Sequence, residues 1–294
     1  MNRILHRTQA AALLCLSVLG SAVQADDDLA SYALTITPRL LSDVRNRGIS
    51  DSLNRPGAKV TVEFAHESGL IGLAEIGSVS KKQFLDGDGA NVLLAGGYRF
   101  GDPEAWHFGV GLAGEFFPGA HFKAPSRIDP ETGAPDDFRS TNYNSQFAVL
   151  EIGYGALQGR ILNVLSENYR GANTAGVCGA QLQFNPDPTK GLECYAKGEH
   201  NSRGSLLYDL DYRYELTPRT SLKLHAGYQQ IRNFSEANFS DYGVGLVHRH
   251  WGFDFGLDYL SPHTRARELY IAEDGDHQRA TDEARWVLSV ARPF

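Results

Sequence analysis

Hydrophobic and polar residues alternate along most of this chain, with the period of two that places successive side chains on opposite faces of a β-strand. In the segment 204–216, apolar and tyrosine side chains occupy even positions and charged side chains occupy odd positions: Leu206, Tyr208, Leu210, Tyr212 and Tyr214 against Asp209, Asp211, Arg213 and Glu215. Segments of this kind, each near the length of a tilted membrane strand, predict about twelve strands. They lie near residues 33–42, 58–66, 69–78, 90–100, 106–117, 143–153, 156–167, 204–216, 219–231, 239–249, 251–261 and 284–294.

The predicted connections between these strands alternate between short and long. Short connections fall at 67–68, 101–105, 154–155, 217–218 and 250, and longer ones at 43–57, 79–89, 118–142, 168–203, 232–238 and 262–283. A barrel in a bacterial outer membrane has tight periplasmic turns and long external loops, whereas a soluble β-sandwich is not expected to sort its connections in this way. The pattern therefore predicts an all-β fold, a transmembrane up-and-down antiparallel barrel of about 12 strands.

The last predicted strand ends on an aromatic residue. Trp286, Leu288, Val290 and Phe294 share one parity and therefore one face, which Arg292 interrupts. A terminal aromatic on a closing strand that faces lipid is typical of outer-membrane barrels. With an even number of strands, this pattern predicts a periplasmic C-terminus and long loops that face the outside.

The N-terminal segment has the features of a signal peptide. Arg3 and Arg7 precede an apolar run over 10–19, and small residues lead to Ala25. We expect cleavage after Ala25, which divides the chain into a signal peptide at 1–25 and a barrel at 26–294. Removing two of 28 basic residues and none of 35 acidic ones leaves a net charge of about −9, which disfavours nucleic-acid binding. The expected location is the bacterial outer membrane.

Two cysteines remain beyond the leader, Cys178 and Cys194. In an exported protein they predict a disulfide that closes a loop, worth about 3 kcal/mol by the chain-entropy estimate, although a pair of free thiols is the alternative. Their spacing, with no histidine cluster, does not indicate a zinc site. No metal or cofactor is expected.

The first predicted hairpin carries a family resemblance. It reads Ser42-Asp43-Val44-Arg45-Asn46-Arg47-Gly48-Ile49-Ser50, followed by Asn54-Arg55-Pro56 and then Ala65-His66-Glu67-Ser68-Gly69. This resembles the TorF porin family, whose members open with a Ser-Asp-x-Arg-x-Arg-Gly-Ile-Ser segment and carry an Ala-His-x-Ser-Gly turn. The resemblance extends more weakly through Tyr154-Gly155 and 201–205 to the C-terminal strand. It implies an outer-membrane barrel with channel activity, and it names no ligand.

The polar residues of inward parity are the candidate pore-lining residues. They are Arg39, Asp43, Arg45, Arg47, Glu63, Asp209, Asp211, Arg213, Lys223, His225, Asp254 and Asp258. If the first strand continues past residue 42, its arginines line one inner wall up to the outer mouth and could form a constriction that attracts carboxylate or phosphate solutes. Alternatively, and in our preferred interpretation, these arginines pair with lumen carboxylates such as Glu63, Asp209 or Asp258 and brace the barrel.

Three clusters invite a chemical hypothesis. The segment His200-Asn201-Ser202-Arg203-Gly204 is similar to the His-x-Ser-x-Gly pattern of outer-membrane phospholipases, but a strand entry accounts for it equally well. The His66–Gly69 segment fits ordinary turn chemistry. His248 and His250 could share a metal, although an aromatic belt at the membrane interface is the favoured interpretation.

These observations predict a monomeric, non-enzymatic channel for passive diffusion of small hydrophilic solutes. Either of two long loops, 118–142 or 168–203, could fold inward and narrow its pore. The alternatives are a structural or surface-binding barrel with a blocked lumen, and, more weakly, a lipid-modifying enzyme. The expected partners are outer-membrane lipid and lipopolysaccharide, small solutes, and the export and barrel-assembly machinery. The sequence does not determine the oligomeric state.

Overall fold

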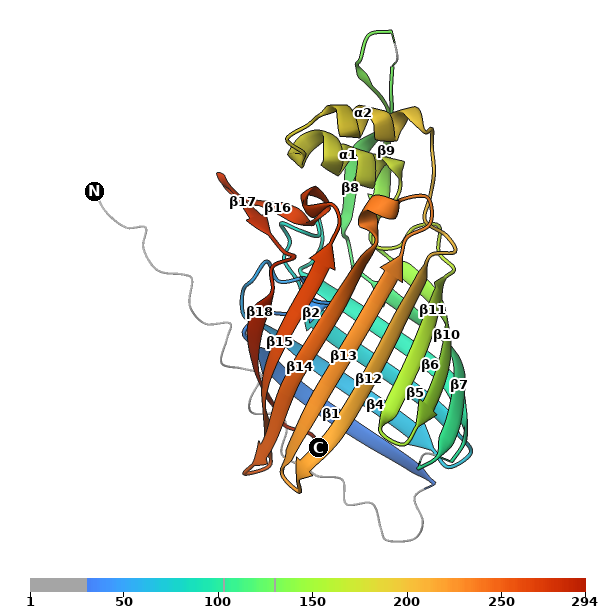
Figure 1. Cartoon of the computed structure of the whole chain (residues 1–294), viewed down its shortest axis with the longest axis vertical. Helices are drawn as coiled ribbons and strands as arrows, with labels where there is room; N and C mark the ends of the chain where they lie inside the picture. The colour runs from blue at the N-terminus through green and yellow to red at the C-terminus, as the bar shows by residue number, and fades with distance from the viewer. Residues whose placement is uncertain (1–30, 103, 130) are drawn as a thin grey trace, which may run out of the picture.

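A computed structural model of the chain describes residues 31–102, 104–129 and 131–294. Twelve antiparallel strands form one closed barrel, each hydrogen-bonded to two neighbours (Figure 1). In chain order they are β1 (Tyr32–Leu41), β4 (Gly57–His66), β5 (Leu70–Ser78), β6 (Ala90–Gly101), β7 (Trp106–Phe116), β10 (Ser145–Tyr154), β11 (Leu157–Val164), β12 (Leu206–Thr217), β13 (Thr220–Gln230), β14 (Phe239–His250), β15 (Phe253–Thr264) and β18 (Arg285–Ala291). The predicted fold class is confirmed, and the predicted strands match these within a few residues. The predicted signal peptide and its cleavage site lie outside the described residues.

The barrel closes between β1 and β18, where Arg39 stands opposite Ala291 and Leu41 opposite Ser289. Beyond the last residue of β18, the pairing continues through two backbone hydrogen bonds between Phe294 and Ile36, of 3.2 and 3.0 Å. Every strand of the ring is therefore paired on both sides, which leaves the barrel no open edge.

Side chains alternate between the outer and inner faces of the wall. On β18, Leu288 is 61% exposed on the outside, whereas the neighbouring Val287 is 3% exposed on the inside. The outward parity is apolar around the ring, and aromatic pairs such as Trp106 with Tyr154 and Tyr259 with Trp286 lie on it. Arg292, which interrupts the outward set of the last strand, places its guanidinium 4.9 Å from the ring centre of Phe294 and 5.4 Å from that of Phe253. A cation–π contact explains how this side chain is accommodated there.

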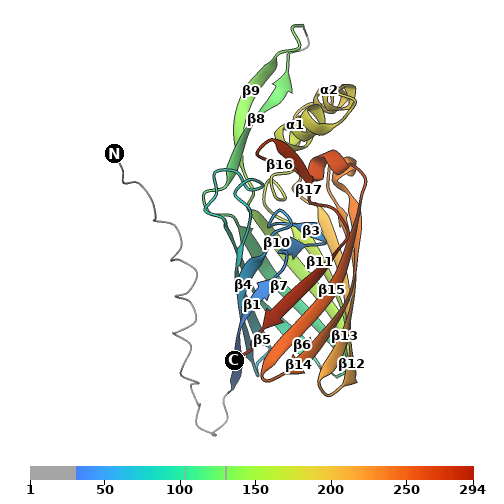
Figure 2. The ribbon, with the colours of Figure 1, turned by 90° about the vertical axis from the view of Figure 1, so that its left-hand side faces the viewer.

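A cap stands over the end of the barrel that carries the long loops, called the loop end below (Figures 1 and 2). It contains the hairpin of β8 (His121–Ile128) and β9 (Pro135–Asn142), the helices α1 (Thr174–Phe184) and α2 (Thr189–Ala196), the short 3₁₀ helices η1 (Ser235–Ala237) and η2 (Arg267–Tyr270), and the hairpin of β16 (Ile271–Asp274) and β17 (His277–Ala280). Asn173 caps α1, because its side-chain oxygen accepts from the Gly176 amide at 2.9 Å. Over the described residues, no helix has both the length and the apolar character needed to cross a bilayer.

The segment 42–56, which we call the inner hairpin, turns into the barrel (Figure 2). It contains β2 (Arg45–Asn46) and β3 (Ile49–Ser50), and Val44, Ile49 and Leu53 are buried. This corrects two expectations. The first strand ends at Leu41 and does not continue as an arginine wall. The segment that folds inward is 42–56, whereas the two long loops expected to do so, 118–142 and 168–203, form the cap.

Candidate functional site

A buried carboxylate organises the inner hairpin. Asp43 accepts the Ser50 hydroxyl at 2.6 Å and the Arg45 Nε at 2.6 Å. Arg45, whose side chain is 1% exposed, also donates to the carbonyl oxygens of Gly48 and Glu283 at 2.5 and 2.7 Å. Asp43 and Arg45 therefore hold the hairpin together from inside, and neither presents a free charge to the lumen. Chain reversal follows at Arg47 and Gly48, both of which have positive φ.

The tip of the inner hairpin reaches the opposite wall of the barrel through Arg47. Its Nη1 lies 2.6 Å from Asp209 Oδ1 on β12, and its Nη2 donates to the Tyr208 carbonyl at 2.9 Å. Asp241 on β14 lies 3.5 Å from the same Nη2. The guanidinium rests against Gly227, where a Cβ would come within 2.7 Å of Nη2 and closer still to Asp241 Oδ1, so a larger residue there would force the Arg47 or Asp241 side chain to shift.

A chain of charged groups continues from Arg47 along the inner wall. His225 on β13 bridges two carboxylates, with Nε2 2.8 Å from Asp241 and Nδ1 2.7 Å from Asp211. Asp211 in turn pairs with Arg160 on β11 at 2.6 Å. The structure thus brings together four of the candidate pore-lining residues, Arg47, Asp209, Asp211 and His225. In the preferred interpretation, the arginines pair with lumen carboxylates. Arg47 does so, because it pairs with Asp209.

A second cluster holds the inner hairpin from the loop end. Arg170 lies 2.7 Å from Asp51 of the hairpin and 3.1 Å from Glu115 of β7. Its guanidinium also stands 5.4 Å from the Phe84 ring centre and 5.2 Å from that of Phe117. Burial opposes the charge of Arg170, but the Asp51 and Glu115 carboxylates outweigh it and hold the pKa of Arg170 above its ordinary range.

The remaining candidate residues lie nearer the turn end, opposite the loop end. Lys223 pairs with Asp258 at 2.6 Å, and Asp254 with Arg249 at 2.8 Å. Arg39, Glu63 and Arg213 also stand on the inward parity of their strands, and all three are exposed. Within the described part of the chain, no group of opposite charge lies within 4.0 Å of any of these three.

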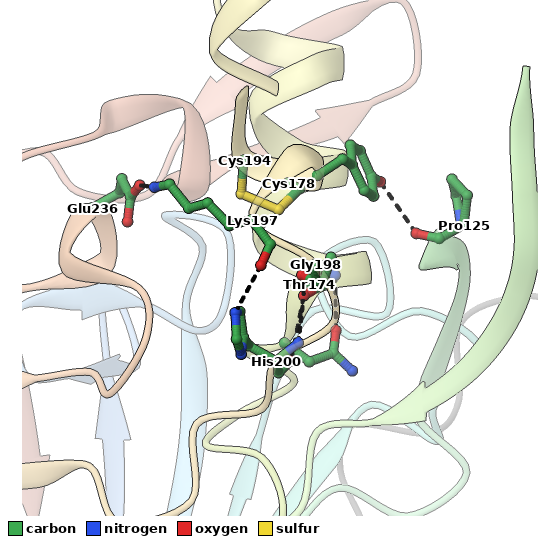
Figure 3. Close-up of a disulfide and its surroundings, with 11 residues drawn as sticks. Pro125, Thr174, Cys178, Cys194, Lys197, Gly198, His200 and Glu236 are labelled. Carbon is green, nitrogen blue, oxygen red and sulfur yellow. Dashed lines mark hydrogen bonds and ion pairs between the residues drawn. A yellow bond between two sulfur atoms is a disulfide. The ribbon is translucent and has the colours of Figure 1, made fainter. Parts of the chain in front are cut away.

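The candidate catalytic pair in 200–204 is not assembled. The Ser202 hydroxyl is fully buried, donates to the Ala172 carbonyl at 2.6 Å and accepts from the Tyr169 amide at 2.8 Å. The His200 ring instead contacts the Lys197 carbonyl, 3.0 Å from Nε2 (Figure 3). Both residues serve to fasten the chain where it leaves the cap.

The other two histidine clusters show turn and surface contacts. His66 Nδ1 accepts the Ser68 amide at 3.0 Å and lies 2.8 Å from its hydroxyl, which closes the exposed β4–β5 turn. His248 lies 2.9 Å from the Thr220 hydroxyl, and the His250 ring packs at a tilt of 46° against the exposed Trp251, with ring centres 4.1 Å apart. Over the described ranges, no three His, Cys, Asp or Glu side chains are grouped to hold a metal ion.

The predicted disulfide is confirmed, and it joins the two helices of the cap (Figure 3). Cys178 of α1 bonds to Cys194 of α2, and both are buried. Next to it, the Tyr195 hydroxyl donates to the Pro125 carbonyl of β8 at 3.1 Å, and Lys197 pairs with Glu236 of η1 at 3.1 Å. The disulfide thus fixes a cap that is tied both to a hairpin and to the loop between β13 and β14.

Three important residues escaped prediction, namely Asp241, Arg170 and Asp51. Asp241 has the inward parity of its strand, so the alternation of 239–249 contained the signal for it. Arg170 lies in a long loop with no periodicity, and only the folded loop brings it to Asp51 and Glu115.

Comparisons with known proteins give a family and a fold. The profile of a family described as a bacterial protein of unknown function (Gcw_chp) matches residues 25–294. A search of the curated proteins finds no match. The TorF resemblance stays a prediction.

Among solved structures, the chain is similar to the NanC porin, with 8% identity, a TM-score of 0.48, and 88% of this chain and 98% of that chain covered. It is also similar to the KdgM porin in complex with disordered oligogalacturonate, with 8% identity, a TM-score of 0.45, and 88% and 99% covered. Both are likenesses of barrel architecture, and the proposals below rest on the chain's own residues.

Proposed function

The chain belongs to the Gcw_chp family of bacterial proteins of unknown function, and from its own residues we propose that it is an outer-membrane channel for passive diffusion of small hydrophilic solutes, narrowed by the inner hairpin. An apolar outer face on a closed barrel supports insertion in the outer membrane. A channel would also agree with the TorF resemblance of the first hairpin. On this proposal the turn end faces the periplasm and the cap faces the outside.

The observation that carries the proposal is the wet inner surface near the turn end. Arg39, Glu63 and Arg213 face inward and remain exposed, so water must fill this part of the lumen. A barrel that served only as a scaffold could fill this space with packed side chains, as small barrels do. Charged groups that line a water-filled passage are the arrangement found in solute channels.

The inner hairpin supports a restricted channel over a wide one. It contacts the lumen wall through polar groups, chiefly Arg47 to Asp209 and Asp51 to Arg170. Neither contact belongs to the backbone hydrogen bonds that join the strands of the closed ring. Displacement of the hairpin would therefore widen the passage without unfolding the barrel.

A second candidate is a surface-binding barrel whose lumen stays blocked. The anchoring of the hairpin on two walls favours it, since Arg47 reaches β12 and β14, while Asp51 pairs with Arg170, which in turn pairs with Glu115 of β7. The third candidate, a lipid-modifying enzyme, would need Ser202 to reach its substrate, and this hydroxyl is buried and hydrogen-bonded to the backbone of the segment 169–172. We propose no catalytic role for it.

Planar-bilayer recordings test these candidates directly. We expect the wild-type barrel to give small conductance steps, and Arg47→Ala to give larger or longer-lived ones, because the hairpin loses its contact with β12. Arg127→Ala, an exposed residue of the β8–β9 hairpin, is the matched control and should leave the steps unchanged. If neither wild type nor Arg47→Ala conducts above the leak, the channel proposal is wrong and the blocked barrel stands.

A further inference from the structure

A cavity of about 710 Å³ lies between the inner hairpin and the cap. Arg47 and Ile49 of the hairpin line its floor, α1 lines its upper side, and loop residues such as Phe84 and Tyr270 line its walls. Its volume falls within the range of small-molecule sites. On the proposed channel pathway, a solute from the loop end would meet this cavity before the narrowed lumen.

The lining favours a flat, apolar body. Phe84, Tyr143 and Phe122 form one aromatic wall, with ring centres 5.2 Å apart for Phe84–Tyr143 and 5.4 Å apart for Phe122–Tyr143. Burial raises the pKa of Tyr143 to about 12 and that of Tyr169, which also lines the cavity, to about 12, as expected where water is scarce.

The helix opposite this wall leaves space. Of the eight α1 residues that line the cavity, four are small, namely Ala175, Gly176, Gly179 and Ala180, and the others are Val177, Leu182, Gln183 and Phe184. The Tyr195 hydroxyl donates a hydrogen bond to the Pro125 carbonyl. Its ring therefore lines the cavity while its polar group already has a partner. Phe122 packs directly on α1 at Gly176, where a Cβ would stand 3.0 Å from its Cζ, so an aromatic ring could stack on the Phe84–Tyr143 part of the wall.

The charged residues of the lining are mostly basic. Four cations line the cavity, Arg47, Lys82, Lys123 and Arg170, against one carboxylate, Glu273, which Gln183 binds at 2.9 Å. The two arginines do not supply an excess of positive charge. Asp209 and Asp241 stand behind Arg47, and Asp51 and Glu115 behind Arg170.

The excess of positive charge lies at the rim. Lys82, Arg55 and Arg279 all converge on the single carboxylate of Asp274, so this cluster, which we call the rim cluster, has two more cations than anions. Its basic side chains are about half exposed, whereas Asp274 is nearly covered. Lys123 adds a further cation, with no carboxylate within 4.0 Å of it in the described parts of the chain.

We infer that this cavity binds a small aromatic carboxylate, whose ring packs against the Phe84–Tyr143 wall while its carboxylate faces Lys82 at the rim. The inference deepens the proposed channel function and rests on it, because it names the class of solute that the channel would admit. Each part of such a ligand meets its complement: apolar surface for the ring, and unbalanced positive charge for the carboxylate.

Calorimetric titration of the purified barrel tests the inference with three ligands of one shape: 2-naphthoate, neutral 2-naphthamide and cationic 2-naphthylmethylammonium. We expect naphthoate to bind best. Lys82→Met should weaken the affinity for naphthoate roughly fivefold, which is the effect of losing one partly exposed charge contact. Lys82→Arg keeps the positive charge and should keep the affinity. Ala180→Phe, which fills the cavity, should abolish binding of all three ligands.

Lys190→Met is the matched control, since Lys190 is a lysine of α2 with exposure similar to that of Lys82, 55% against 46%, and pairs with Glu193 outside the cavity. Equal binding of the three ligands, or an equal loss in Lys82→Met and Lys190→Met, would overturn the inference, as would the absence of naphthoate binding. Conductance without naphthoate binding leaves the channel proposal intact and rejects only the solute class. Binding without conductance rejects the channel and keeps the cavity as a ligand site.

Discussion

Arg47 and Asp209 form an ion pair of 2.6 Å between the tip of the inner hairpin and a strand of the opposite wall. The two residues are 162 positions apart in the chain, and both side chains are largely buried, at 9% and 13% exposure. A hairpin that could have extended outward as an ordinary loop is thereby fastened inside the barrel. The pair is the contact most directly responsible for narrowing the lumen.

The energy of this pair can be measured with a double-mutant cycle. We expect Arg47→Met and Asp209→Asn to show a coupling of about 1–2 kcal/mol in the free energy of unfolding, because the two charges meet in a partly dry environment. Urea unfolding of the barrel in detergent gives the four values required. The exposed pair Arg127–Asp136 is the control and should couple by less than about 0.5 kcal/mol. Equal coupling in the two cycles would mean that Arg47 does not act as an anchor.

Removal of the Arg170 charge should be more costly than removal of the charge on Arg47. Arg170→Met leaves Asp51 and Glu115 buried without their cation, which typically costs about 3–5 kcal/mol. Thermal unfolding should show a clearly lowered Tm. Adding Asp51→Asn and Glu115→Gln removes the uncompensated charges and should restore most of the loss. If the triple variant is no more stable than Arg170→Met, the cost comes from lost packing on Phe84 and Phe117 instead.

Reduction of the disulfide should loosen the cap and spare the barrel. Cys178–Cys194 joins α1 to α2, and neither helix belongs to the closed ring of strands. Loss of the link costs about 3 kcal/mol in the chain-entropy estimate. Limited proteolysis with and without a reductant should show new cleavage within 168–203 only, and the Cys178→Ala/Cys194→Ala variant should behave like the reduced protein. The folded barrel should keep its own band on gels of unheated samples, and loss of that band on reduction would contradict this prediction.

The rim cluster should respond to acid. A hydrogen bond from Lys82, and the charges of Arg55 and Arg279, hold the pKa of Asp274 below the ordinary carboxyl range. A carboxyl group with a lowered folded-state pKa stabilises the fold above its unfolded pKa, near 4, and this contribution disappears as the pH falls through the lowered value. Amide hydrogen exchange in 271–280 should therefore be slow at pH 7. In strong acid it should become faster than the pH dependence of exchange in an unstructured chain would give.

Asp274→Asn is the control for this response. It should show faster exchange already at pH 7 and little further change in acid, because asparagine has no charge to lose. An acid response of the same size in Asp274→Asn would assign the effect to another group.

The lumen was partly predictable from the sequence. Asp209, Asp211 and His225 could be assigned to the inner face, because parity along a strand is a local property that each strand carries in its own residues. Arg170 and Asp51 could not be assigned in this way. They lie in long connections, where no period relates neighbouring residues and where contacts form between segments far apart in the chain.

The strands, their facing and the closed barrel were determined by the sequence itself, since alternation of apolar and polar residues leaves only one face fit for lipid and one for water. The direction of the inner hairpin was decided only by the tertiary structure. The hydrogen bond between Asp43 and Ser50 turns the chain, but whether Arg47 then points to solvent or to Asp209 depends on a strand 162 residues away. Local patterns cannot encode such a pairing, because its energy appears only when the barrel has closed and brought both side chains to the same wall.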